Sequence, residues 1–311
     1  MGRRQSPPHP AGRVTWYFMQ YKSLKRLSYL SFVLPAFAVF ISVIIFPLLF
    51  SFALGFTQWR GYGEMRFIGF DNYIRMFQDP VFFIGLRNNL MIVMVSVFGQ
   101  IPLGLLLAYM LYRKMVRRGD IFEVLIFLPI TISSVIIAQL WNRIFSPVGI
   151  FTAFMRMVTG NQDYIMTIVE NRYFAIVPIM FVLLWQHTSL YMVIFLANLQ
   201  RIPNSVIEAA RLEGASEGNI FGRLIVPMMG YVIFINSILA ISGSFKSFDL
   251  IYSMTGGGPA QYTTVIAVYM YNTTFVHQNY GYGSSLSIII IVFIVLSLLL
   301  TRAVTKIFRV E

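Results

Sequence analysis

The residues of this 311-residue chain form no motif of a kind that performs catalysis. The three histidines, His9, His187 and His277, lie in different segments, and no H-E-x-x-H pair of metal ligands is present. The chain has no cysteine, which excludes disulfides, thiolate metal sites and cysteine nucleophiles. It also lacks a GxxxxGK[ST] loop that would hold nucleotide phosphates. We therefore expect no enzymatic activity, no metal and no cofactor in this chain itself.

One segment, residues 202–227, is polar and rich in helix-forming residues, whereas the stretches on either side of it are apolar. Ser205 and Glu208 have the S-x-x-E spacing of a capping box, in which two side chains satisfy backbone donors of the first helical turn. Gly214 can adopt the left-handed backbone that ends a helix, and a second helix is expected to run through Phe221. Such an element is suited to insertion into a groove of another protein. A solvated surface helix is the alternative.

A second group of polar residues lies where the chain is otherwise apolar. Polar side chains inside a membrane are costly and usually face a cavity or another helix. One apolar stretch carries Gln186 and His187, and the next carries Ser244, Lys246 and Ser247. For His187 a role as a hydrogen-bonded packing residue stays open, and Lys246 has an alternative role as the partner of Asp249 on one helix face.

The composition places these segments in a membrane. The chain is 57% hydrophobic and 12% charged, with a mean hydropathy of +0.71, far from the balance of a soluble protein. Its net charge of +12 would suit a nucleic-acid-binding protein, but there the basic residues form stripes on a polar fold. A bilayer core is crossed by roughly 20 apolar residues of helix. The charge-free stretches predict an all-α integral membrane protein with six transmembrane helices, over residues 30–56, 89–112, 122–145, 174–199, 229–251 and 284–305.

The positive charges predict how the chain is oriented. Lys and Arg near membrane helices are retained on the cytoplasmic side. Sixteen of the 24 Lys and Arg residues lie in the amino-terminal segment 1–28, in the loops after the second and fourth predicted helices, and in the carboxyl-terminal tail. We therefore expect both termini in the cytoplasm and a transmembrane domain over residues 29–311. The loops 57–88, 146–173 and 253–283 are expected outside, as a docking surface.

The polar segment resembles the EAA loop of bacterial ABC importer permeases. The matching residues are Glu208, Ala209, Ala210, Gly214, Ala215, Phe221 and Pro227. The chain departs from that pattern at Glu213, where Asp is usual, at Leu224 and Val226, and at Gly218, where an aromatic residue is common. Further stretches are similar to the larger, maltose-type permease subunit of the carbohydrate branch: Phe67 to Phe77, Phe127 to Ile136, Leu199 to Pro203 and Thr255 to Thr264.

The resemblance implies a cytoplasmic coupling helix, within a loop over residues 202–228, that inserts into a cleft of an ATP-hydrolysing subunit. The implied coupling residues are Glu208, Ala209, Ala210, Glu213, Gly214, Ala215 and Phe221. The implied partners are a second, different permease subunit, two cytoplasmic ATP-binding subunits that hold ATP and Mg²⁺, and a solute-binding protein outside the bacterial inner membrane. Counted along the family pattern, the sugar site falls on Gln186, His187, Gly243, Ser244 and Ser247, with Lys246 beside them in the substrate path.

Two questions stay open at this point. Lys246 and His187 admit an anionic saccharide such as a uronic-acid oligomer, and the chain loosely resembles the alginate importer's permease, but no motif separates alginate from neutral oligosaccharides. The second question is the energy source. An ion-coupled secondary transporter would need acidic groups within the membrane, and only Glu123 and Asp249 are candidates, both near the ends of predicted helices.

Overall fold

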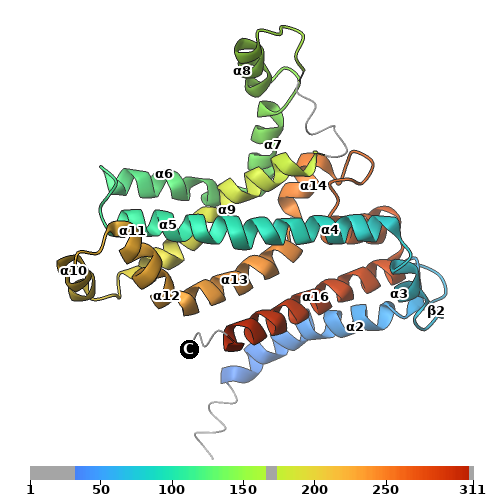
Figure 1. Cartoon of the computed structure of the whole chain (residues 1–311). Coiled ribbons are helices and arrows are strands. Elements are labelled where there is room, and N and C mark those ends of the chain that lie inside the picture. The colour runs from blue at the N-terminus through green and yellow to red at the C-terminus, as the bar shows by residue number, and fades with distance from the viewer. Residues whose placement is uncertain (1–31, 166–173, 308–311) are drawn as a thin grey trace, which may run out of the picture. The chain divides into compact units, whose positions relative to one another are not determined.

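The computed structural model describes residues 32–165 and 174–307 (Figure 1). The predicted amino-terminal segment 1–28 lies outside these ranges. The chain divides into two compact units, one ending at Ala53 and the other beginning at Leu54. In the first unit the described residues belong to one apolar helix, Phe32–Leu54, which includes a wider turn, η1 (Ile41–Ile45), and then α2 (Phe46–Leu54).

The second unit contains the other long apolar helices. They are Pro80–Tyr112, α9 (Ile176–Leu199), Gly230–Thr255 and Tyr280–Ala303, the last within α16 (Tyr280–Ile307). Together with Phe32–Leu54, five helices in the described ranges are long and apolar enough to cross a membrane. The count reaches the six that the sequence predicted only if a bent helix pair is taken as one span.

The second predicted span began too late. The helix starts at Pro80 and not at residue 89, and it runs through α4 (Pro80–Val95), η2 (Ser96–Gln100) and α5 (Ile101–Tyr112). Asp79 caps it, because the Asp79 Oδ1 atom accepts a hydrogen bond of 2.9 Å from the Val81 N–H. Proline at the first helical position is also favourable there. The prediction used Arg87 as a boundary, whereas the helix carries this arginine inside it.

The third predicted span, residues 122–145, is not one helix. It consists of α6 (Gly119–Thr131) and α7 (Ser134–Ile144), which are bent by 100° relative to each other. Pro129 lacks a backbone N–H and weakens the last turn of α6. Ile132 and Ser133 then adopt extended backbone, with ψ near 138° and 134°. The apolar composition predicted the length of this segment but not the break.

The fifth span is also interrupted. α13 (Gly230–Phe245) ends before Lys246, and α14 (Asp249–Thr255) begins three residues later. Lys246 and Asp249 therefore lie on either side of the interruption, and the described part of the chain has no ion pair between them. The predicted pairing on one helix face is wrong, because no single helix face includes both residues.

The stretch 253–283, expected to be a loop, contains α15 (Ile266–Tyr271) and η4 (Asn272–Val276). Two neighbouring amides on α4 hold its start. Asn88 Nδ2 donates to the carbonyl oxygens of Tyr262 and Thr264, at 2.8 and 2.7 Å, and Asn89 Oδ1 accepts from the Ile266 N–H at 2.9 Å. The Gly- and Thr-rich composition hid a buried apolar run, in which Val265, Ile266 and Val268 are fully buried.

Smaller elements surround the ends of the long helices. A two-stranded antiparallel sheet pairs β1 (Thr57–Gln58) with β2 (Arg66–Phe67), so that Thr57 faces Phe67. α3 (Asp71–Met76) follows, and α8 (Ile150–Thr159) lies after α7. Between α9 and α13 the chain forms α10 (Asn204–Leu212), α11 (Glu217–Asn219), η3 (Ile220–Ile225) and α12 (Val226–Met228).

The apolar core forms two clusters, and the second one supports α10. It joins side chains of α5 and α9 to Ile207 of α10 and to Ile220 and Ile225 of η3. α5 and α9 approach each other closely at Gly104, where an added Cβ would lie 2.9 Å from the Tyr191 Cβ. The segment after α9 is therefore packed on two long helices and is not a free surface loop.

Candidate functional site

The segment over residues 202–228 is the first candidate site. α10 begins at Asn204, after the extended residue Pro203, and no side chain caps this start. The predicted capping box of Ser205 and Glu208 is therefore wrong, since Ser205 already lies inside the first turn. Gly214 has a φ of +85°, which confirms that it makes the turn after α10. Ser216 caps the second helix, because its Oγ accepts from the Asn219 N–H at 3.4 Å.

The two faces of α10 differ in exposure. Ile207 is fully buried, and Ala210 packs against the second core cluster. Glu208, Ala209, Glu213 and Gly214 are exposed. Leu212, the last residue of α10, is 90% exposed. The sequence analysis did not select Leu212, which is exposed on the same helix as Glu208 and Ala209.

Of the remaining coupling candidates, Ala215 and Phe221 lie on the packed side. Both are partly buried against the second core cluster. The Phe221 ring contacts the Tyr109 ring of α5, with centroids 5.0 Å apart. Phe221 therefore fixes the second helix of the segment to α5.

A cluster of charged and polar side chains fixes α10 to α5. The Glu217 carboxylate accepts from the Tyr109 hydroxyl at 2.7 Å, from Arg113 Nη2 at 3.3 Å and from Arg211 Nε at 3.1 Å. We call these four residues the Glu217 cluster. Tyr109 and Arg113 belong to the end of α5, whereas Arg211 belongs to α10. The cluster ties both helices to one carboxylate.

The hydrogen bonds stabilise the charged form of the carboxylate. The hydrogen bond from Arg211, followed by that from Tyr109, lowers the pKa of Glu217 to about 2. The same contact with Glu217 raises the pKa of Arg211 above its ordinary value. Glu217 is one of three acidic residues in this segment, with Glu208 and Glu213, and no motif of the sequence singled it out. Tyr109 and Glu217 are 108 residues apart, so no local pattern indicated that they meet.

The lowered pKa of Glu217 predicts a dependence on pH. A carboxyl group whose pKa falls on folding contributes stability above its unfolded value, here 4.5, and loses that contribution as the pH falls through about 2. The melting temperature of the chain should therefore exceed that of Glu217→Gln at pH 6, and the difference should shrink between pH 4.5 and pH 3. Thermal unfolding in detergent measures it, with Glu213→Gln, an exposed neighbour, as the control. A difference that does not change with pH would contradict the assignment.

The second candidate site is the polar group within the apolar helices, and the structure does not bring all its members together. Gln186 is buried on α9; its Nε2 donates to Ser134 Oγ at 3.3 Å, while its Oε1 has no partner among the described residues. His187 is half-buried, with Nδ1 3.3 Å from the Leu183 carbonyl oxygen. That contact lies within the helix and agrees with a packing role.

The members on α13 have different surroundings. Ser244 is buried; its hydroxyl donates to the Ala240 carbonyl oxygen at 2.7 Å, and its Oγ lies 3.2 Å from Ser96 Oγ. Gly243 and Lys246 are exposed. The Ser247 hydroxyl donates to the Gly243 carbonyl oxygen at 3.2 Å. Ser244 therefore serves helix packing, whereas Gly243, Lys246 and Ser247 remain at the end of α13.

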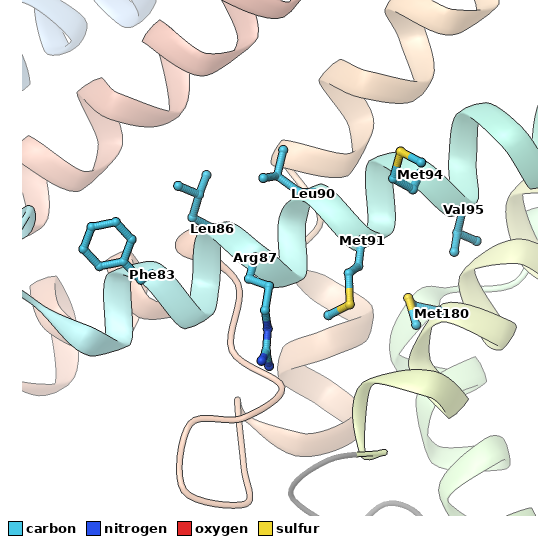
Figure 2. Close-up of a pocket in the computed structure, with 8 residues that line it drawn as sticks. All are labelled: Phe83, Leu86, Arg87, Leu90, Met91, Met94, Val95 and Met180. Atoms are coloured by element: carbon cyan, nitrogen blue, oxygen red, sulfur yellow. The ribbon is translucent and has the colours of Figure 1, made fainter.

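An apolar cavity of about 550 Å³ lies along α4 (Figure 2). Figure 2 shows that seven of its eight labelled side chains extend from α4 and that Met180 extends from the neighbouring helix. The lining comprises Phe83, Leu86, Arg87, Leu90, Met91, Met94, Val95 and Met180. Apart from Arg87 it offers no hydrogen-bonding side chain, so it does not suit a ligand rich in hydroxyl groups.

Comparisons with known proteins agree on one family. Residues 100–310 match the family described as "Binding-protein-dependent transport system inner membrane component". The chain is 31% identical over 288 residues to the probable ABC transporter permease protein YurN of Bacillus subtilis, covering 92% of this chain and 97% of that protein. It is 32% identical over 259 residues to the lactose transport system permease protein LacF of Rhizobium radiobacter, covering 82% and 86%.

A solved structure shares the fold. It is that of a bacterial alginate ABC transporter in complex with an alginate pentasaccharide-bound periplasmic protein. One of its chains superposes with a TM-score of 0.80 over 93% of this chain and 97% of that chain, at 20% sequence identity. At this identity the likeness concerns the fold and not the ligand.

Proposed function

We propose that this chain, which belongs to the family of binding-protein-dependent transport system inner membrane components, forms half of the path by which a saccharide enters the cell. Its resemblance to ABC importer permeases is thereby confirmed. As a permease subunit it is a multi-pass membrane component without catalysis of its own, and ATP hydrolysis belongs to partner subunits. Relatives named as permeases for lactose and for diacetylchitobiose support a saccharide as the substrate.

The single observation that carries the coupling role is the exposed, firmly anchored helix α10. Glu208, Ala209, Leu212 and Glu213 face outward, while Ile207 and the Glu217 cluster fix the other side. A helix that is attached in this way can pass a displacement of a bound partner on to α5, because the contacts between α10 and the rest of the chain hold the helix in place. In our proposal α10 enters a cleft of a cytoplasmic ATP-binding subunit, which holds ATP and Mg²⁺, and Glu208 pairs there with a basic group.

The proposed substrate path uses the polar residues near the middle and end of α9 and α13. Gln186 has a buried side-chain carbonyl oxygen without a partner among the described residues, and a movement of α9 that exposed this atom would let a saccharide hydroxyl donate to it. His187, Gly243, Lys246 and Ser247 complete the proposed path, and Ser244 positions α13 beside η2. A second, different permease subunit would supply the other half, and a solute-binding protein would deliver the saccharide from outside. Both termini would then lie in the cytoplasm.

Vesicle uptake tests this function against the ion-coupled alternative. The complete transporter is reconstituted with ATP inside the proteoliposomes and its solute-binding protein outside, and entry of a radiolabelled saccharide is measured. We expect uptake that requires ATP and continues after an uncoupler has removed the proton gradient. Uptake that ignores ATP and stops with the uncoupler would replace our proposal by a secondary transporter. Vesicles that contain a non-hydrolysable nucleotide serve as the control.

A further inference from the structure

A polar cavity of about 920 Å³ lies in the second unit, at the end of the helix Pro80–Tyr112 that is remote from α10. Figure 1 shows α3 and β2 at the α4 end of this helix, and α10 and α11 at its α5 end. We call it the outer cavity. It is lined by Gln58, Arg60, Tyr62, Ile68, Asp71, Asn72, Arg75, Val81, Gln261, Tyr269, Thr273, His277, Gln278, Asn279 and Tyr282. No motif of the sequence pointed to this set, because it joins residues more than 200 positions apart.

The wall of the outer cavity is held in place from behind. The Asp79 carboxylate accepts hydrogen bonds from the hydroxyls of Tyr269 and of Tyr282, the latter at 2.8 Å. The Asn72 amide donates to the carbonyl oxygens of Gly55 and Thr57, at 3.0 and 2.9 Å. These bonds join the start of α4 to α15 and α16, and α3 to β1 and the residues before it. The cavity is thus formed in the chain before any ligand arrives.

The charges of the wall favour an anion. Arg60 and Arg75 line the cavity, and within the ranges that the structure describes neither forms an ion pair. The Arg75 guanidinium carbon lies 4.9 Å from the centre of the Tyr282 ring, a stacking contact that leaves the positive charge unneutralised. Asp71 is the one carboxylate in the wall. A planar guanidinium group matches the geometry of a carboxylate, which it can bind through two parallel hydrogen bonds.

The remaining polar groups suit hydroxyls. Five wall residues carry amides with both donor and acceptor capacity, namely Gln58, Asn72, Gln261, Gln278 and Asn279. Gln261 and Gln278 have φ angles of +67° and +51°, which are uncommon for residues other than glycine. Such strained positions are concentrated at ligand sites. The Gln261 Oε1 atom is buried and has no partner among the described residues.

We propose that the outer cavity binds a saccharide that carries carboxylate groups, of the uronic-acid type, before it reaches the transmembrane path. Arg60 and Arg75 hold a carboxylate, and the amides of the wall bind ring hydroxyls. A volume of about 920 Å³ lies within the range of small-molecule sites. An acidic surface loop of the solute-binding protein is the other candidate, but a concavity lined with amides fits a sugar better than a protein surface. The inference rests on the proposed function and adds a second, outer site to it.

Isothermal titration of the complete transporter in nanodiscs, without nucleotide or solute-binding protein, tests this site. The probes are trigalacturonate and the neutral maltotriose. We expect trigalacturonate to bind and Arg60→Gln to weaken it by about tenfold or more, the loss that one hydrogen bond to a charged group represents. Arg66→Gln is the matched control, since Arg66 is an exposed arginine on the same hairpin that does not line the cavity. Added salt should weaken the binding.

Three results would overturn the proposal. The first is no heat of binding with trigalacturonate, and the second is equally strong binding of maltotriose. The third is an Arg60→Gln variant that docks the solute-binding protein more weakly but binds trigalacturonate as before, which would assign the cavity to protein docking. Vesicle uptake separates this site from the proposed function. If ATP-driven saccharide uptake persists without trigalacturonate binding, only the outer site falls. If trigalacturonate binds but no ATP-driven uptake occurs, the proposed function falls instead.

Discussion

Saccharide uptake is expected to fall by about thirtyfold or more when Glu208 is replaced by alanine, because truncating one partner of a charge pair in an interface costs roughly 2–5 kcal/mol and each 1.4 kcal/mol is about tenfold. Glu208 is exposed on α10 and makes no ion pair in the part of the chain that the structure describes, so the folded permease does not need it. Membrane insertion and thermal stability should therefore stay unchanged. The measurement is ATP-driven uptake in proteoliposomes, beside the melting temperature of the same preparation.

Asp120→Asn is the matched control for Glu208→Ala. Asp120 is an exposed acidic residue outside the α10 segment, and its loss removes the same charge from the chain. Gly214→Val should also lower saccharide uptake, because a φ of +85° is strained for a β-branched residue and the turn after α10 would be disturbed. Normal uptake in both Glu208→Ala and Gly214→Val would remove α10 from the coupling mechanism.

Replacing Glu217 by glutamine is expected to uncouple ATP hydrolysis from uptake. The carboxylate joins Arg113 and Tyr109 of α5 to Arg211 of α10, and a neutral amide cannot hold both arginines. The number of saccharide molecules imported per ATP should fall by about tenfold, whereas ATP hydrolysis continues. We infer this split because the outward face of α10 stays intact but its attachment to the transmembrane helix loosens. Parallel assays of phosphate release and uptake measure the ratio.

A double-mutant cycle distinguishes a cluster from a chance contact. Tyr109→Phe removes one hydrogen bond to Glu217 while keeping the ring contact with Phe221. If the two residues act as one unit, Glu217→Gln combined with Tyr109→Phe should lower the number of saccharide molecules imported per ATP little further than Glu217→Gln alone. Fully additive losses would show that the two residues act separately.

One helix connects the two ends of the second unit. Pro80–Tyr112 is 33 residues long, which at about 1.5 Å per residue spans about 50 Å. Asp79 at its start holds Tyr269 and Tyr282 in the wall of the outer cavity, and Tyr109 in its last turn holds Glu217. In our proposal a movement of α10 would reach the outer cavity through this single continuous helix. The two polar attachments at its ends are the positions at which this transmission can be broken.

Much of this arrangement was predictable because lipid imposes a simple rule on sequence. Long uncharged stretches predicted the helices at residues 174–199 and 284–305 to within a few positions at most ends. The rule failed where a charged residue does not mark the end of a membrane helix. Arg87 lies inside a helix whose start is set by Asp79 and Pro80, and the apolar stretch around Pro129 contains a bend of 100° that hydropathy does not record.

The candidate sites were predictable only where neighbouring residues in the sequence determine the local structure. The turn at Gly214 follows from the backbone freedom of glycine, and the structure confirms it. The capping box at Ser205 failed because the N-cap residue is Pro203, two positions earlier than the motif requires. The Glu217 cluster and the outer cavity depend on contacts between residues that are distant in sequence. No spacing along one chain indicates such contacts.

The absence of cysteine from this chain allows a direct test of the central claim, that α10 docks into an ATP-binding subunit. Leu212→Cys places a single thiol on the exposed face of α10, where the leucine is 90% exposed. A thiol-directed photo-crosslinker on that cysteine should yield one major product, with the ATP-binding subunit, in the assembled transporter. Val148→Cys, at a position that is 91% exposed and distant in sequence, should yield no such product. Equal cross-linking from both positions, or none from Leu212→Cys, would contradict the account.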